Sequence, residues 1–91
     1  MKAAFSAIIS GRVQMVLFRD FTIRHAQALG IVGEVENMSD GTVRVHAEGE
    51  KKQLEELLAL LRKGPLLARV SGVQVSWLPR TGAHATFSIV Y

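Results

Sequence analysis

The stretch TVRVHAEGEKKQLEELLALLRKG, residues 42–64, carries the clearest structural signal in the chain. In its first eight residues Val43, Val45 and Ala47 alternate with polar side chains, and this period of two predicts a strand with one buried face. The pattern then changes, because leucines recur at intervals of three and four residues, which is typical of an amphipathic helix. The helix is expected to end at Gly64, since a proline follows and cannot continue it. A strand that leads into a helix indicates a mixed α+β domain.

The rest of the chain contains five further segments with patterns of regular structure. Strands are predicted over residues 3–10, 31–37, 69–77 and 83–91, and a second helix over residues 20–29. Asp20 is expected either at the N-cap of that helix or in its first turn, and Gly30 just beyond its end. The order β-α-β-β-α-β with an added C-terminal strand is that of the ferredoxin-like fold. We therefore predict one domain, residues 1–91, an α+β two-layer sandwich with an antiparallel sheet and two helices on one face.

The composition excludes several classes of protein. The 91 residues contain no cysteine, so disulfides and thiolate chemistry are excluded, and a cytoplasmic location is expected. No apolar run approaches the roughly 20 residues of a membrane span, and the N-terminal segment is interpreted as a buried strand rather than a signal peptide. A formal net charge of +3 is weak evidence for nucleic-acid binding, and the strand over residues 42–49 lacks the aromatic side chains on which RNA bases stack. We expect no nucleic-acid partner, no membrane partner and a monomer.

The loop between the first strand and the first helix is a candidate anion site. Its main-chain amides, from about Gln14 to Phe18, lead into a helix N-terminus and can converge on one anion. Arg19 adds a planar, permanently charged fork that suits phosphate oxygens. A second interpretation is open, because solvation alone explains most arginines in such loops.

Three other features of the sequence are candidates for a functional role. Asn37 ends a predicted strand, where it either bonds its own backbone in a turn or offers an amide that orients a water molecule. The histidines His25, His46 and His84 show no spacing typical of metal ligands, so no metal site is predicted. Asp40 is interpreted as a turn residue.

Four segments together resemble the acylphosphatases: GRVQMVLFR (11–19), ALGIVGEVEN (28–37), DGTVRV (40–45) and KGPLLARVSGV (63–73). The resemblance spans nearly the whole chain and ends with the aromatic FSIVY. It implies the ferredoxin-like fold, and hydrolysis of carboxyl-phosphate anhydrides such as acetyl phosphate, carbamoyl phosphate or 1,3-bisphosphoglycerate to a carboxylate and inorganic phosphate. It also implies that the reaction needs no metal and no cofactor.

The resemblance assigns roles to individual residues. It makes Arg19 and Asn37 the catalytic residues, with Asn37 positioning the attacking water. It places the substrate phosphate on the loop of residues Arg12, Val13, Gln14, Met15, Val16, Leu17, Phe18 and Arg19. Inorganic phosphate or sulfate is then expected as product or competitor.

The chain departs from the family pattern at three positions. Met15 stands where the family usually has glycine, Leu17 where a small or varied residue is usual, and Glu34 where tryptophan is common. If residue 15 needs a left-handed conformation, the methionine costs roughly 1–2 kcal/mol. Glu34 and Glu36 add negative charge to the strand that carries Asn37, although alternation places both on the opposite face. Two alternatives stay open. The first is a phosphate- or ligand-binding domain with weakened catalysis. The second is a domain of a larger carbamoyl-transfer enzyme, although a length of 91 residues favours a stand-alone protein.

Overall fold

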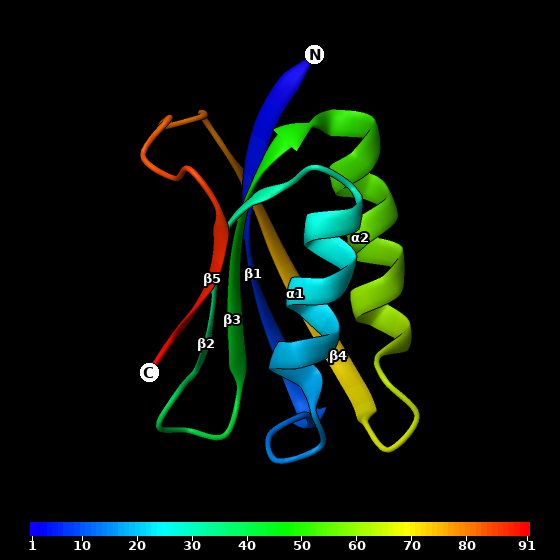
Figure 1. Ribbon diagram of the computed structural model, residues 1–91. Coiled ribbons are helices and arrows are strands. Elements are labelled where there is room, and N and C mark those ends of the chain that lie inside the picture. The colour runs from blue at the N-terminus through cyan, green and yellow to red at the C-terminus, as the bar shows by residue number, and fades with distance from the viewer.

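Five strands form one sheet, and two helices cover one of its faces (Figure 1). The computed structural model describes all residues, 1–91. The elements are β1 (Lys2–Arg12), α1 (Phe18–Ala28), β2 (Val32–Asn37), β3 (Val43–Glu50), α2 (Lys51–Lys63), β4 (Arg69–Leu78) and β5 (Phe87–Val90). The strand order is β4-β1-β3-β2-β5. This arrangement confirms the predicted ferredoxin-like two-layer sandwich.

The last strand differs from the prediction in direction and in length. β1 pairs antiparallel with β3 and β4, and β2 pairs antiparallel with β3, but β5 runs parallel to β2. The prediction of an antiparallel sheet is therefore wrong for β5. The loop of residues 79–86 crosses from β4, at one edge of the sheet, to β5 at the other edge. The chain reverses direction in this loop, so β5 runs opposite to β4 and in the same direction as its neighbour β2. Residues 83–86, predicted as strand, belong to this loop.

The core lies between the sheet and the helices and follows the alternation predicted for β3. Val43, Val45 and Ala47 are fully buried, and β1 adds residues at alternate positions from its own buried face. The four predicted leucines of α2 are buried on the same side: Leu54, Leu57, Leu58 and Leu61. The outer face of the sheet therefore carries the polar half of β3.

The helix α1 begins two residues before its predicted start. Leu17 occupies the N-cap position, so Asp20 lies in the first turn, the second of its two expected places. There its carboxylate accepts a 2.9 Å hydrogen bond from Nε of Arg24, one helical turn away. Gly30 follows the helix in a left-handed conformation, φ +72°, as predicted for a C-terminal glycine. The start of the helix thus depends on the conformation of the preceding loop.

Candidate active site

A cleft of about 380 Å³ opens where the chain passes from β1 into α1. It brings Arg19, from the first turn of α1, together with Asn37, from the end of β2. The residues that line it are Val13, Met15, Leu17, Phe18, Arg19, Asp20, Asn37 and Ile89. The two side chains predicted to be catalytic therefore share one cavity.

A bulge at the end of β1 directs the chain into the loop. The pairing of β1 with β4 shifts register between Ser10 and Gly11. Gly11 has a φ of +117°, and a Cβ atom there would lie 2.1 Å from the carbonyl oxygen of Arg69. Only glycine fits this position, because both the dihedral angle and the space exclude a side chain.

The loop itself alternates in the sign of its backbone φ angles. Met15 and Leu17 have φ values of 61° and 64°, while the residues beside and between them do not have positive φ. Such alternation turns successive N–H groups toward one side and forms an anion-binding concavity. The N–H groups of Val13 to Phe18 donate no hydrogen bond to any other main-chain group. A set of unpaired donors therefore stands at the start of α1, where the helix dipole adds positive potential.

The side chain of Gln14 fastens this loop to the turn between β2 and β3. Its Nε2 donates hydrogen bonds of 2.8 and 2.9 Å to the carbonyl oxygens of Met38 and Thr42. These two acceptors flank the turn that follows Asn37. The hydrogen bonds therefore set the distance between the loop amides and the end of β2.

Arg19 carries an unpaired positive charge at the cleft. None of the ion pairs in the protein involves its guanidinium. The aromatic ring of Tyr91 lies against it, with 5.4 Å between the guanidinium carbon and the ring centroid. A cation–π contact of this kind restrains the side chain without neutralising its charge.

Asn37 presents a buried acceptor that has no partner. Its Oδ1 is shielded from solvent and accepts no hydrogen bond within the protein. The turn that follows is stabilised instead by Asp40, whose carboxylate accepts hydrogen bonds from the amide and hydroxyl of Thr42. This lowers the pKa of Asp40. Because buried carbonyl oxygens in native proteins are nearly always satisfied, the amide of Asn37 is left for a group that enters the cleft.

The acidic residues of β2 are held away from the cleft by Arg44. Glu34 and Glu36 pair across the strands with β3, and Arg44 donates hydrogen bonds to both carboxylates, at 3.0 Å to Glu36. Burial opposes the charge of Arg44, but the hydrogen bonds that it donates to Glu34 and Glu36 outweigh this effect and raise its pKa. Both glutamates are therefore half-buried and share the single positive charge of Arg44.

The predicted phosphate-binding residues divide into two groups. Val13, Met15, Leu17, Phe18 and Arg19 line the cleft. Arg12, Gln14 and Val16 do not: Arg12 is exposed at the end of β1, Gln14 bonds the turn, and Val16 is buried in the core. Ile89 and Tyr91 were not predicted to lie at the cleft, because no local sequence pattern places the last strand beside β2.

The fold and the cleft together define a small ferredoxin-like domain with a candidate anion site, and comparisons with known proteins agree with this fold. The family model for acylphosphatases matches residues 5–89. The acylphosphatase of Methanocella arvoryzae is 45% identical over 86 residues, which covers 94% of this chain and 97% of its own. That of Dehalococcoides mccartyi is 48% identical over 86 residues, covering 93% and 94%. The solved acylphosphatase of Bacillus subtilis superposes with a TM-score of 0.94 over the whole of both chains, at 33% identity. The chain therefore belongs to the acylphosphatase family.

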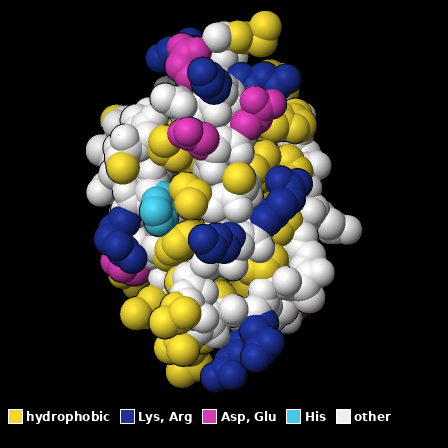
Figure 2. Space-filling view, turned by 90° about the vertical axis from the view of Figure 1, so that its right-hand side faces the viewer, with side chains coloured by type: hydrophobic (Ala, Val, Ile, Leu, Met, Phe, Trp, Pro, Cys, Tyr) yellow, Lys and Arg dark blue, Asp and Glu magenta, His cyan; other side chains and the backbone are white.

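Other features bear on the predicted partners. No helix of the structure has the length and apolar character needed to cross a bilayer. On the side that the helices cover, Lys and Arg side chains are scattered among hydrophobic and uncharged ones (Figure 2). This face carries no continuous basic stripe of the kind typical of a nucleic-acid interface.

Proposed function

We propose that the cleft hydrolyses acyl phosphates to a carboxylate and inorganic phosphate, with the phosphoryl group in the loop and the water on Asn37. The observation that carries this proposal is the unpaired Oδ1 of Asn37 in the same cavity as Arg19 and the free loop amides. The family relation supports the same reaction.

The phosphoryl group develops charge on its peripheral oxygens during transfer, and the cleft supplies donors for them. The loop amides and the guanidinium of Arg19 bind these oxygens without a metal ion. Preorganised donors of this kind are worth about 2.7–4 kcal/mol each in comparable oxyanion sites. In this proposal catalysis comes mainly from two effects of the loop amides and Arg19, which position the phosphoryl group and stabilise the charge on its oxygens.

Asn37 orients the nucleophile rather than acting as a base. Its Oδ1 accepts a hydrogen bond from water and points the water lone pair at phosphorus. The new O–P bond forms as the bond between phosphorus and the acyl oxygen breaks, and the carboxylate leaves with its electron pair. The proton of the water passes to a phosphoryl oxygen, so inorganic phosphate is the second product. A carboxylate is a good leaving group, and no strong general base is required.

The alternative of a domain with weakened catalysis is not favoured. The family relatives are named as acylphosphatases. Met15 retains the left-handed backbone that glycine adopts most easily, so the departure from the family pattern leaves the direction of the loop amides intact.

The test measures hydrolysis of acetyl phosphate or benzoyl phosphate with a chelator present. We expect turnover by the wild type, and loss of both turnover and inhibition by phosphate in Arg19→Ala. Asn37→Ala should lower kcat by at least about 100-fold, the effect of one positioning group, while inhibition by phosphate is kept. Arg24→Ala is the matched control, because Arg24 lies on the same helix, is exposed and does not line the cleft. Wild-type rates in both Arg19→Ala and Asn37→Ala would refute the assignment.

A monomeric state and a cytoplasmic location stay predictions for this enzyme. The first is tested by sedimentation over a range of protein concentrations, with a single species of one chain expected. The second is tested by cell fractionation.

A further inference from the structure

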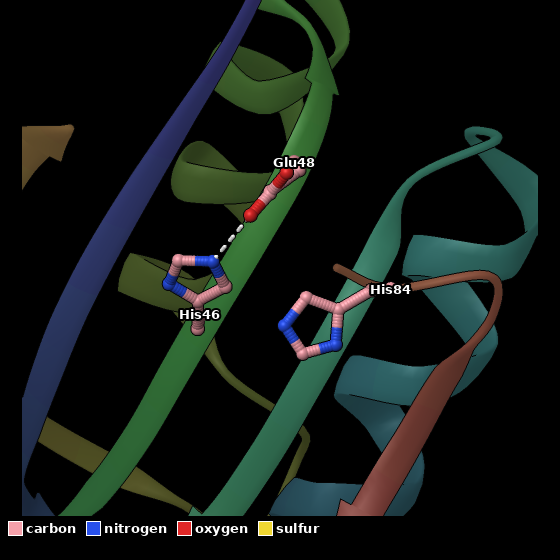
Figure 3. Close-up of side chains that lie close together, drawn as sticks. All are labelled: His46, Glu48 and His84. Carbon is pink, nitrogen blue, oxygen red and sulfur yellow. Dashed lines mark hydrogen bonds and ion pairs between the residues drawn. The ribbon is translucent and has the colours of Figure 1, made fainter. Parts of the chain in front are cut away.

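A second cluster of polar side chains lies on the outer face of the sheet, and none of its residues lines the cleft of the active site. His46 and Glu48 are two residues apart on β3 and so project from the same face. His84 reaches them from the loop of residues 79–86 (Figure 3). One ligand-type atom from each of the three side chains lies within 4.8 Å of the others. This grouping joins residues that show no ligand spacing along the chain.

Glu48 holds the loop that delivers His84. The side chain of Glu48 is 3% exposed, and its Oε1 accepts 3.1 Å hydrogen bonds from the amides of Thr81 and Gly82. Its Oε2 accepts a 2.6 Å hydrogen bond from the hydroxyl of Thr81 and lies 2.8 Å from Nε2 of His46. The carboxylate is therefore fixed in position from both sides before any ion arrives.

The two histidines are also held close together. Their ring centroids are 5.2 Å apart, with 39° between the planes. The side chain of His46 is 14% exposed and that of His84 is 22% exposed, so both rings are largely shielded from water. Glu34, from the neighbouring strand β2, places a carboxylate oxygen 4.0 Å from Nδ1 of His84. This separation is longer than a hydrogen bond, and Glu34 also accepts a hydrogen bond from Arg44, so Glu34 adds negative charge near His84 without fixing its ring.

A cleft of about 300 Å³ gives access to the cluster, and Glu48 and His84 are among its lining residues. Lys2 and Arg80 also line it, and their charges oppose a cation. Both side chains are exposed, so solvent and salt screen them, whereas Glu48 is buried and acts at short range. The net charge close to the ligand atoms is therefore negative.

We propose that His46, Glu48 and His84 form a binding site for a divalent transition-metal ion, with Zn²⁺ as the best match. Two imidazoles and one carboxylate are a ligand set that zinc prefers, and hard ions such as Mg²⁺ prefer oxygen ligands alone. The 300 Å³ cleft that Glu48 and His84 line would give water or a small anion access to a fourth coordination position.

Binding requires only small movements of the side chains. Zinc–ligand bonds of about 2.0–2.2 Å place tetrahedral ligand atoms roughly 3.3 Å apart. His46 Nε2 and Glu48 Oε2 are slightly closer than this at 2.8 Å, and the widest of the separations is within 4.8 Å. The ion takes the place of the hydrogen between His46 and Glu48, and the neutral His46 ring then carries its proton on Nδ1. The site would fasten the 79–86 loop to β3 and stabilise the folded state rather than serve hydrolysis.

The test titrates metal-stripped protein with Zn²⁺ alone and follows binding by calorimetry and the melting temperature by circular dichroism. We expect one ion per chain and a higher melting temperature with zinc, because a ligand that binds only the folded state stabilises it. His84→Ala and His46→Ala should each weaken binding by at least about tenfold, since changes in the shell outside the ligands already cost 10–100-fold. Mg²⁺ should give no comparable shift.

His25→Ala is the matched control, because this third histidine lies on α1 beside Phe21 and outside the cluster. It should bind zinc as the wild type does. The two histidine variants carry the test, since Glu48→Gln removes contacts that the fold itself uses. The proposal would be overturned if the wild type showed no saturable zinc binding, or if His84→Ala and His46→Ala each bound zinc with the affinity of the wild type. Either result leaves the assignment of the hydrolytic cleft unaffected.

Discussion

Replacing Met15 by glycine should make the protein more stable, although glycine usually has the opposite effect. Met15 has a φ of 61°, a left-handed conformation that costs a residue with a Cβ atom roughly 1–2 kcal/mol. Its side chain is 99% exposed, so its removal loses no burial. Glycine adds about 0.5–1 kcal/mol of conformational entropy to the unfolded chain. The two ranges leave a stabilisation of between about 0 and 1.5 kcal/mol, and about 0.5–1 kcal/mol lies at the centre of that range.

The measurement is the melting temperature, supported by urea unfolding. For a domain of this size 1 kcal/mol corresponds to about 4–8 °C, so Met15→Gly should melt roughly 2–8 °C higher than the wild type. Met15→Ala is the control, because alanine removes the same side chain but keeps the Cβ atom and its strain. It should stay within about 0.5 kcal/mol of the wild type, as surface substitutions usually do. A Met15→Gly protein that melts lower, or a Met15→Ala protein that gains as much, would show that the loop is not strained at this position.

Three further outcomes follow from side chains that hold the loop and the outer face. Burial raises the pKa of Glu48, but hydrogen bonds from Thr81 and other donors outweigh it and lower the pKa from 4.5 to about 2. The stability that the Glu48 carboxylate contributes is therefore complete above pH 4.5 and is lost as the pH falls toward 2. In urea unfolding with a chelator present, the free energy of unfolding of Glu48→Gln should fall less steeply with decreasing pH than that of the wild type. Gln14→Ala removes two hydrogen bonds and should cost about 1–3 kcal/mol in urea unfolding, with weaker inhibition by phosphate; unchanged inhibition would contradict its role in placing the loop. Arg44→Met should also cost about 1–3 kcal/mol by leaving two half-buried carboxylates unpaired, and restoration of stability on adding Glu34→Gln and Glu36→Gln would verify the cause.

The sequence predicts those features that depend on neighbouring residues. The alternation of β3 and the leucine spacing of α2 are confirmed, because each repeats within a few residues and reports directly on a buried face. The candidate catalytic pair also meets in one cleft, as the resemblance implied. Gly30 and Gly64 follow the two helices as predicted, because each adopts the positive φ that ends a helix.

Features that depend on distant segments could not be predicted in this way. No local pattern shows that the 79–86 loop crosses to the far edge of the sheet, so the direction of β5 and its contribution of Ile89 to the cleft were missed. The same crossing places His84 beside His46, although 38 positions separate them in the chain (84 − 46). The alternation of β3 predicts that Glu48 faces solvent. In the structure Glu48 is buried, and its carboxylate accepts hydrogen bonds from the 79–86 loop, which no local pattern places there.

The attachment of Gln14 to both sides of the β2–β3 turn restricts how that turn can change. Surface turns normally accept extra residues, and lengthening them has little effect on the rest of a domain. Here the carbonyl groups of Met38 and Thr42 both accept hydrogen bonds from Gln14 and so fix the spacing between this turn and the loop that lines the cleft. An insertion between them would separate the two acceptors and release the side chain of Gln14, so the length of this short hairpin is tied to the shape of the candidate active site.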